Sequence, residues 1–217
     1  MRCPHCNEEL PDVTIACSHC GTPLNAPQPP QATASPRQPD FGALFTAALQ
    51  TWKANLGDLV LLTLVFMVVV WIPIVNIGFI AGYNRALLKV HRGGKAQIGD
   101  LFSAWDCFGN LLVVSLGYFI AAVILAQVPL VGSLATLVLG FVAAPAALAI
   151  IDAGKPAIEA CRWSIETLKE DLANWLMALI AGWLIGGAGI VLILVGLLFT
   201  IPLGQLIIIR QYEGHRP

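Results

Sequence analysis

Apolar residues dominate three long stretches of this chain, and none of the three contains a charged residue. The stretches cover residues 59–84, 107–151 and 172–209. Placing one charged side chain at the centre of a bilayer costs about 2.5–3.5 kcal/mol on insertion scales. The pattern therefore predicts three membrane-embedded units, separated by segments that hold all the charged residues.

Turn-forming residues interrupt each stretch near its middle, at residues 72–76, 128–133 and 186–189. A spanning helix needs about 20 residues, so the second and third stretches each hold two helices. The first also holds two when its arms extend to Asn55 and His91. We therefore expect about six transmembrane helices arranged as three helical hairpins; five spans are the alternative.

The positions of the cations predict the orientation. With six spans, all 12 lysines and arginines lie on one side of the membrane, and the three turns carry none. Cytoplasmic segments are enriched in lysine and arginine, so this side is expected to be the cytoplasm. The sequence thus predicts a multi-pass protein of the inner (cytoplasmic) membrane with both its N- and C-termini in the cytoplasm.

The same order of elements recurs three times, over residues 41–95, 96–155 and 156–214. Each approximate repeat begins with a segment whose apolar residues share one face of a helix, and continues as span, turn and span. Such an amphipathic interfacial helix either binds the headgroup region of the lipid bilayer or packs on the protein's own spans. The apolar faces comprise Phe41, Leu44, Phe45, Ala48, Leu49 and Trp52; then Ile98, Leu101, Phe102, Trp105 and Phe108; then Ile158, Cys161, Ile165, Leu168 and Leu172.

Composition agrees with an all-α integral membrane protein whose membrane domain covers residues 41–214. Of 217 residues, 57% are hydrophobic and only 12% are charged, whereas soluble proteins carry about 25% charged residues. Polar residues within the predicted spans, such as Asn76 and Gln127, are typical of hydrogen bonds between helices, and we do not expect an enzyme. Acidic residues beside the spans, among them Asp106, Asp152 and Asp171, are expected to form a solvated rim.

Two glycine pairs indicate close packing of helices: Gly78 with Gly82, and Gly182 with Gly186. The packing is expected within the helix bundle. A homo-oligomer interface through the same glycine-rich faces is the alternative.

Four cysteines near the N-terminus form two C-x-x-C pairs, Cys3 with Cys6 and Cys17 with Cys20. Each pair can occupy two vertices of a tetrahedron, and four thiolates complete the coordination shell of one Zn²⁺. Since no open position remains, the predicted metal is structural; iron in a rubredoxin-like site is the alternative. The predicted zinc ribbon covers residues 1–24, and the proline-rich residues 25–40 are expected to form a flexible linker.

The charge of residues 1–24 indicates the kind of partner. Arg2 is opposed there by Glu8, Glu9 and Asp12. Modules that bind nucleic acid are normally basic, so nucleic-acid binding is not expected. An unknown protein partner, or a purely structural role, remains for the ribbon.

The stretch CPHCNEELPDVTIACSHCGTPL resembles the short zinc ribbon found at the N-terminus of many bacterial membrane proteins. The residues that match this family's pattern are Cys3, Pro4, Cys6, Cys17, Cys20, Gly21 and Leu24, whereas Asn7 replaces its first glycine. The resemblance implies a zinc-bound ribbon and no single activity.

The membrane body resembles uncharacterised bacterial inner-membrane proteins of the YciC type and the membrane domain attached to some glycerophosphodiester phosphodiesterases. The matching residues lie in 91–95 (HRGGK), 101–116, 157–175 and 201–212. The resemblance implies a six-helix membrane body without an assigned activity, and no catalysis is carried over from the soluble phosphodiesterase domain.

Taken together, these features predict a non-enzymatic membrane protein with a cytoplasmic zinc ribbon and a scaffold, assembly or envelope-homeostasis role. A permease or channel for a small neutral or apolar solute is the alternative, because spans without charges offer no path for strongly ionic solutes.

Overall fold

The computed structural model describes residue 20 and residues 41–128, 130–192 and 195–217. The chain divides into two units, Met1–Arg37 and Gln38–Pro217. The second unit contains every helix described below. The four cysteines of the predicted ribbon lie in the first unit, where only Cys20 is among the described residues.

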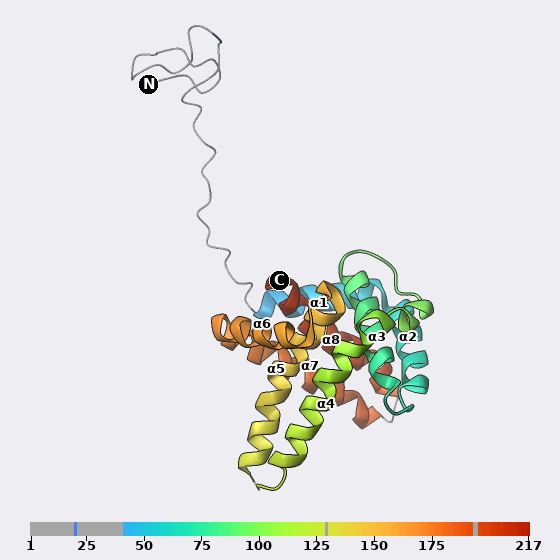
Figure 1. Ribbon diagram of the computed structural model, residues 1–217. Helices are drawn as coiled ribbons and strands as arrows, with labels where there is room; N and C mark the ends of the chain where they lie inside the picture. The colour runs from blue at the N-terminus through green and yellow to red at the C-terminus, as the bar shows by residue number, and fades with distance from the viewer. Residues whose placement is uncertain (1–19, 21–40, 129, 193–194) are drawn as a thin grey trace. The chain divides into compact units, whose positions relative to one another are not determined.

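The described part of the second unit is entirely helical (Figure 1). Its α-helices are α1 Phe41–Ala54, α2 Leu56–Val69, α3 Asn76–His91, α4 Phe108–Leu125, α5 Val131–Ala153, α6 Ala157–Glu170, α7 Leu172–Ala188 and α8 Val195–Gly214. Three short 3₁₀ helices accompany them: η1 Ile98–Phe102, η2 Trp105–Cys107 and η3 Gly189–Leu192. The predicted all-α class is therefore confirmed for the described residues.

Several helices are long and apolar enough to cross a membrane. Within the described ranges, three qualify alone: the segment Ile98–Leu125 that ends with α4, then α5, then α8. Two further pairs of helices are bent at a short break, α1 with α2 by 86° and α6 with α7 by 109°. If each pair counts as one span, the number of candidate spans rises to five. The length and hydropathy of these helices are therefore those of a membrane protein, with three to five candidate spans.

Helix α8 is the centre of the bundle. It packs along α7 and also contacts α1, α2 and α3, while α4 packs on α5. Its residues from Leu206 to Ile209 are all buried. By contrast, only 6% of the most apolar stretch within Ile98–Leu125 is buried. Figure 1 shows α4 and α5 extending beyond the other helices. The surface of this pair therefore needs an apolar surrounding.

The turns before α3 and α5 share an unusual backbone conformation. Ile74 has φ of 67° and Leu130 has φ of 64°, and each follows a proline in the sequence. The Val75 amide donates to the carbonyl oxygen of Pro73 at 2.7 Å, which closes a γ-turn around Ile74. Positive φ is unfavourable for a β-branched residue, so this turn stores strain.

The second leading segment differs from the expected amphipathic α-helix, because it forms η1 and η2 with a break between them. The amide of Gln97 donates to the Asp100 carboxylate at 2.9 Å, and the hydroxyl of Ser103 donates to the Asp100 carbonyl at 2.8 Å. Such local side-chain bonds compete with α-helical hydrogen bonding. They explain why tight 3₁₀ turns replace the regular helix here.

The third turn begins further along the chain than the position of the glycine-rich residues 186–189 predicts. Helix α7 continues through Gly186 and Gly187 and ends at Ala188. An added Cβ at Gly204 would meet the backbone nitrogen of Gly186 at 2.9 Å, so α7 and α8 approach each other closely here. This packing outweighs the low helix propensity of glycine.

Candidate functional site

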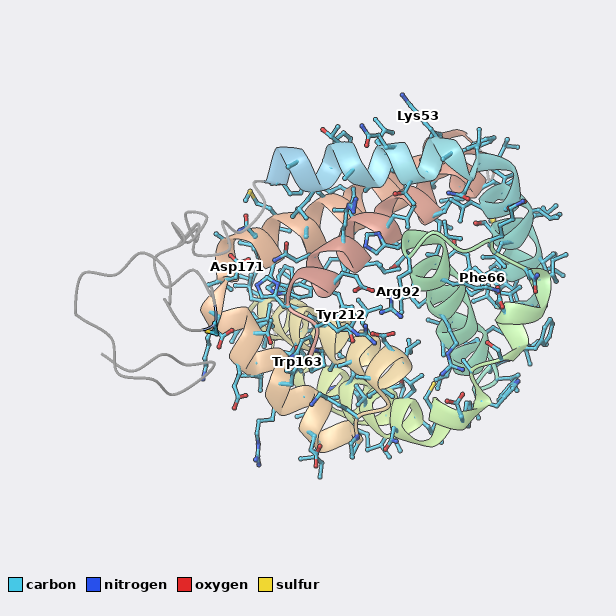
Figure 2. All side chains as sticks on the ribbon, turned by 90° about the horizontal axis from the view of Figure 1, so that it is seen from above. Lys53, Phe66, Arg92, Trp163, Asp171 and Tyr212 are labelled. Atoms are coloured by element: carbon cyan, nitrogen blue, oxygen red, sulfur yellow. The ribbon has the colours of Figure 1, made fainter. Side chains whose placement is uncertain are left out.

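Charged side chains converge where α3, α5 and α8 end, and we call Arg92, Asp152, Glu213 and Arg216 the ion-pair cluster. Arg92 lies 2.7 Å from the Asp152 carboxylate and 2.6 Å from that of Glu213. Arg216 reaches the other oxygen of Asp152 at 2.8 Å. Figure 2 looks down on this end and places Arg92 near the middle of the bundle, close to Tyr212. The cluster joins the C-terminal ends of three helices that are distant in sequence.

Asp152 is the hub of the ion-pair cluster. Its side chain is only 5% exposed, and it also accepts a hydrogen bond from the Tyr212 hydroxyl at 3.2 Å. The hydrogen bond to Asp152 raises the pKa of the Arg92 guanidinium above its ordinary value, so Arg92 remains charged. A buried carboxylate with two guanidinium partners fixes the ends of α3, α5 and α8 relative to one another.

A second polar group surrounds Asp171, at the bend between α6 and α7. Its carboxylate accepts hydrogen bonds from Asn174 at 3.0 Å and from Gln211 at 2.9 Å. The Nε2 of His215 lies 3.4 Å from it. Since Gln211 and His215 belong to the last part of the chain, this group fastens the α6–α7 bend to α8.

Arg85 ties α3 to η1 and η2. It donates two hydrogen bonds to the Asp106 carboxylate, at 2.9 and 3.0 Å, and one to the Ser103 carbonyl at 2.6 Å. Lys89, one turn further along α3, pairs with Asp100 at 3.2 Å. These pairs bring the second leading segment onto α3.

The expectation of a solvated acidic rim is wrong for two of the residues it named. Asp152 and Asp171 have buried side chains and specific partners, whereas Asp106 is 67% exposed. Their partners lie up to 64 residues away, as Arg216 does from Asp152, so hydropathy and local spacing carried no signal for the pairing. One available hint was that Asp152 and Asp171 directly border charge-free stretches.

A cavity of about 200 Å³ lies between α3, α4, α5, α7 and α8. Three polar side chains line it, those of Asn84, Ser115 and Gln205. Neither Asn76 nor Gln127, the polar residues singled out in the sequence, is among its lining residues. Gln127 is exposed and donates to the carbonyl of Val123 at 3.3 Å. Several polar side chains from three helices therefore gather around open space in this cavity.

The two glycine pairs pack within the chain. An added Cβ at Gly78 would meet the ring of Trp105 at 2.8 Å, and one at Gly82 would collide with the backbone of Leu101. On α7, a Cβ at Gly182 would meet the carbonyl oxygen of Gly204 at 2.8 Å. Both faces are therefore occupied by other elements of the same chain, as intramolecular packing requires.

The apolar face of α1 also packs on the chain's own helices. Leu44 and Ala48 are buried, and the indole Nε1 of Trp52 donates to the carbonyl of Phe199 on α8 at 2.9 Å. Of the two interpretations of the leading segments, α1 follows the one in which the helix packs on the spans.

We tested whether the donor atoms of the predicted ligands match the preference of zinc. Cys20 is exposed in a turn, while Cys3, Cys6 and Cys17 lie outside the described residues. Four thiolates in two C-x-x-C pairs suit Zn²⁺, which takes four sulfur ligands in structural sites. In the part of the chain that the structure describes, no group of three or more His, Cys, Asp or Glu side chains is arranged to hold a metal.

Comparison with known proteins bears on the N-terminal module alone. A zinc-ribbon domain matches residues 2–24. No curated protein and no solved structure matches the chain. The zinc ribbon is thus established by a family match, and the resemblance of the membrane body to YciC-type proteins gains no support from it.

Proposed function

We propose that the chain is a non-enzymatic, multi-pass scaffold of the cytoplasmic membrane, which presents its zinc ribbon to a protein partner in the cytoplasm. The observation that carries the proposal is the ion-pair cluster. It compensates the charges of Arg92, Asp152, Glu213 and Arg216 among themselves and locks three helix ends together. Helix ends that are held together by ion pairs and carry no net charge suit a rigid scaffold better than a channel whose helices must move to open.

Six spans in three hairpins fit the distribution of exposed residues. The turns between α2 and α3 and between α4 and α5 expose large apolar side chains, with Trp71 81% and Leu130 82% accessible. Exposed apolar residues of this size are unfavourable in water and are expected at a membrane interface, where Trp is enriched. The ion-pair cluster lies at the opposite ends of α3 and α5, as a hairpin that crosses and returns requires.

Short helices are the difficulty for six spans, and the bilayer can accommodate them. Helices α2, α3 and α7 contain 14, 16 and 17 residues, which corresponds to about 21–26 Å at 1.5 Å per residue. The hydrocarbon core is about 30 Å thick. Local thinning of the bilayer and snorkelling of flanking Lys and Arg side chains close a gap of this size.

The zinc ribbon supports the cytoplasmic orientation. We assign Cys3, Cys6, Cys17 and Cys20 as ligands of one structural Zn²⁺. The bound metal would supply the folding free energy of a module too small to form a core, without a position open for catalysis. Thiolates stay reduced in the cytoplasm, and the excess of lysine and arginine on the same side agrees with that placement.

Loss of the ribbon tests the scaffold proposal. The full chain, the double variant Cys3→Ser with Cys6→Ser, and a control with Cys107→Ser and Cys161→Ser are each crosslinked in membranes and purified. We expect one set of crosslinked proteins from the full chain and the control, and its loss from the ribbon variant. An unchanged set from a ribbon variant that no longer holds zinc would contradict the proposal.

The cavity lined by Asn84, Ser115 and Gln205 favours the second candidate function, a permease for a small neutral solute. Three hydrogen-bonding groups in an apolar bundle resemble a site for a small polar, uncharged molecule. Flux of glycerol or urea into liposomes measures it. A permease would lose transport in Gln205→Leu and keep it in Gln127→Leu, which removes the same side chain from an exposed position.

A further inference from the structure

Helix α6 leaves the two isoleucines of its predicted apolar face exposed, whereas Leu168 on the same face is buried. The residues that it buries are mostly small: Ala157, Ala160, Ser164 and Thr167. The Ser164 hydroxyl donates to the carbonyl oxygen of Val142 at 2.7 Å, where α6 crosses α5. The larger residues Ile158 and Ile165 remain exposed, Ile158 to 76%, and so does Leu172, the last residue of the predicted face, which lies at the start of α7. In this respect α6 differs from α1.

Charges are arranged asymmetrically around α6. The exposed Arg162 and Lys169 each follow an exposed isoleucine by four residues, so they lie beside the apolar face. The exposed Glu159, Glu166 and Glu170 lie beyond them, further from that face. Arginine and lysine beside the apolar face are typical of a helix lying among lipid headgroups.

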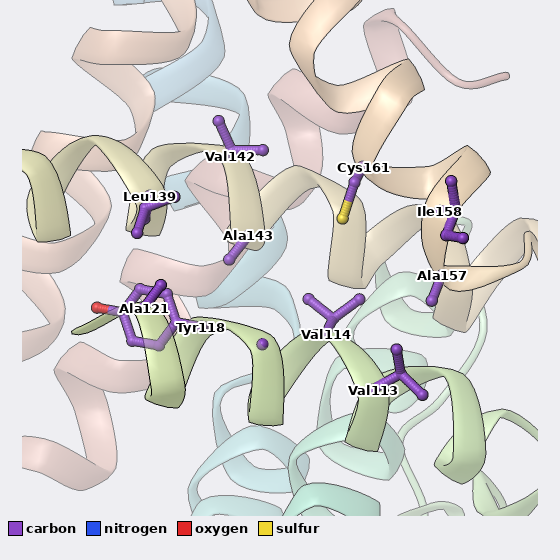
Figure 3. A pocket seen from close by; sticks show the side chains of 11 residues that line it. Val113, Val114, Tyr118, Ala121, Leu139, Val142, Ala143, Ala157, Ile158 and Cys161 are labelled. Carbon is purple, nitrogen blue, oxygen red and sulfur yellow. The ribbon is translucent and has the colours of Figure 1, made fainter. Parts of the chain in front are cut away.

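A groove opens where α6 meets α4 and α5. Its volume is about 330 Å³, and its floor includes Val113, Gly117 and Ala121 of α4. Figure 3 shows Cys161 and Ile158 of α6 at one end of the groove and Tyr118 and Ala121 toward the other. The lining is almost entirely apolar, with Tyr118 as its main polar group.

The groove has the dimensions of an acyl chain. From Val113 to Ala121, α4 rises about 12 Å at 1.5 Å per residue, against about 15 Å for half of a 30 Å hydrocarbon core. A second apolar groove, of about 360 Å³, lies on the other side of the crossing, between α5, α6 and α7. Val142 borders both grooves, and Lys169 stands at the edge of the second.

We propose that α6 is a phospholipid-binding helix: the groove between α4, α5 and α6 holds an acyl chain of a bilayer glycerophospholipid, whose anionic headgroup lies beside Arg162 and Lys169. The inference rests on the proposed function in one respect, namely that α4 and α5 span the membrane. A lipid is the proposed occupant because Val113 and Tyr118 line the groove and also belong to the exposed apolar surface of α4, which a bilayer would cover. Charge complementarity with Arg162 and Lys169 selects anionic headgroups such as phosphatidylglycerol.

Gly117 permits a sharp test of the acyl-chain site. An added Cβ at Gly117 would meet nothing within 4 Å, so Gly117→Leu fills the groove without a collision at its Cβ. Gly109→Leu is the matched control, because it lies on the same helix with the same open surroundings but outside the groove. The readout is native mass spectrometry of the full chain released from nanodiscs that contain phosphatidylglycerol and phosphatidylcholine. We expect retained lipid in the wild type and in Gly109→Leu, and a loss in Gly117→Leu.

The headgroup is tested separately. Arg162→Ala and Lys169→Ala should each weaken the preference for phosphatidylglycerol over phosphatidylcholine about fivefold, since one basic residue near the headgroups contributes about 1 kcal/mol. Lys53→Ala, which removes an exposed lysine from the end of α1, should leave the preference unchanged. Equal retention by Gly117→Leu and the wild type overturns the acyl-chain site, and an unchanged preference in both cation variants overturns the headgroup assignment.

Labelling of a single cysteine at Leu130 with an impermeant maleimide, before and after the membrane is opened, distinguishes failure of the phospholipid site from failure of the proposed topology. If the turn before α5 is accessible only from outside and the lipid result is negative, the phospholipid site alone is wrong. If that turn is accessible from the cytoplasm, the proposed topology is wrong and the phospholipid site falls with it.

Discussion

Arg92 and Asp152 lie 60 residues apart in the sequence, yet the guanidinium of one contacts the carboxylate of the other at 2.7 Å. The pair joins the end of α3 to the end of α5. Because Arg216 also reaches Asp152, the C-terminal segment of the chain closes the same contact. Tyr212, which lies in the third predicted repeat, also donates to Asp152 at 3.2 Å, so residues of all three predicted repeats meet at this carboxylate.

Asp152→Ala is expected to destabilise the membrane domain by about 2 kcal/mol, because it removes the buried carboxylate that accepts hydrogen bonds from Arg92 and Tyr212 and pairs with Arg216. Asp106→Ala removes an exposed carboxylate that also pairs with an arginine, and should cost less than about 1 kcal/mol. Thermal unfolding of both variants in the same detergent measures the difference. Equal losses would show that burial of Asp152 does not govern its contribution.

Gly204→Ala tests the contact between α7 and α8. A Cβ at this position would collide with the carbonyl oxygen of Gly182, so we expect a loss of about 2 kcal/mol or more. Gly187→Ala, on the exposed side of α7, meets nothing within 4 Å and should be neutral or stabilising by up to about 1 kcal/mol. Unfolding by heat distinguishes the two, and a neutral Gly204→Ala would refute the close approach.

Ile74→Gly and Leu130→Gly should stabilise the protein, since both residues have positive φ that glycine adopts without a steric cost. The strain removed is about 1–3 kcal/mol for each, less the greater unfolded-state entropy of glycine. Ile72→Gly, in the same turn but without positive φ, should destabilise instead. Melting temperatures that fall in all three variants would argue against the two strained turns.

Cys17→Ser should abolish zinc binding, because three thiolates no longer complete the tetrahedral shell. Elemental analysis of the purified chain is expected to return one zinc ion for the wild type and for Cys161→Ser, and none for Cys17→Ser. Iron in place of zinc would identify the rubredoxin-like alternative, and zinc retained by Cys17→Ser would show that this residue is not a ligand.

If the chain has six spans, the three turns lie on one side of the membrane and the charged loops lie on the other. Single cysteines at Trp71, Leu130 and Ile190 should react with an impermeant maleimide added outside, in a chain from which the native cysteines have been removed. Cysteines at Lys95 and Lys155 should react only after the membrane is opened. Labelling of Lys95 from outside would show instead that the first repeat crosses the membrane an odd number of times.

The sequence determined where the apolar helices lie, because the cost of placing a charge in hydrocarbon depends on the charge itself and hardly on its neighbours. The charge-free stretch that begins at residue 59 therefore located α2 and α3, with ends at Leu56 and His91 close to the predicted Asn55 and His91. Cysteine spacing located the zinc ribbon in the same way, since metal coordination needs only the four ligands and the short turns between them.

Only the tertiary structure decided what each helix face touches. Spacing predicted equivalent apolar faces for α1 and α6, yet Leu44 is buried whereas Ile158 is exposed. Helical periodicity defines a face but carries no information about the element that covers it. For the same reason the sequence placed Asp152 in a solvated rim: its burial comes from Arg92 and Arg216, which approach it only when the ends of α3, α5 and α8 meet.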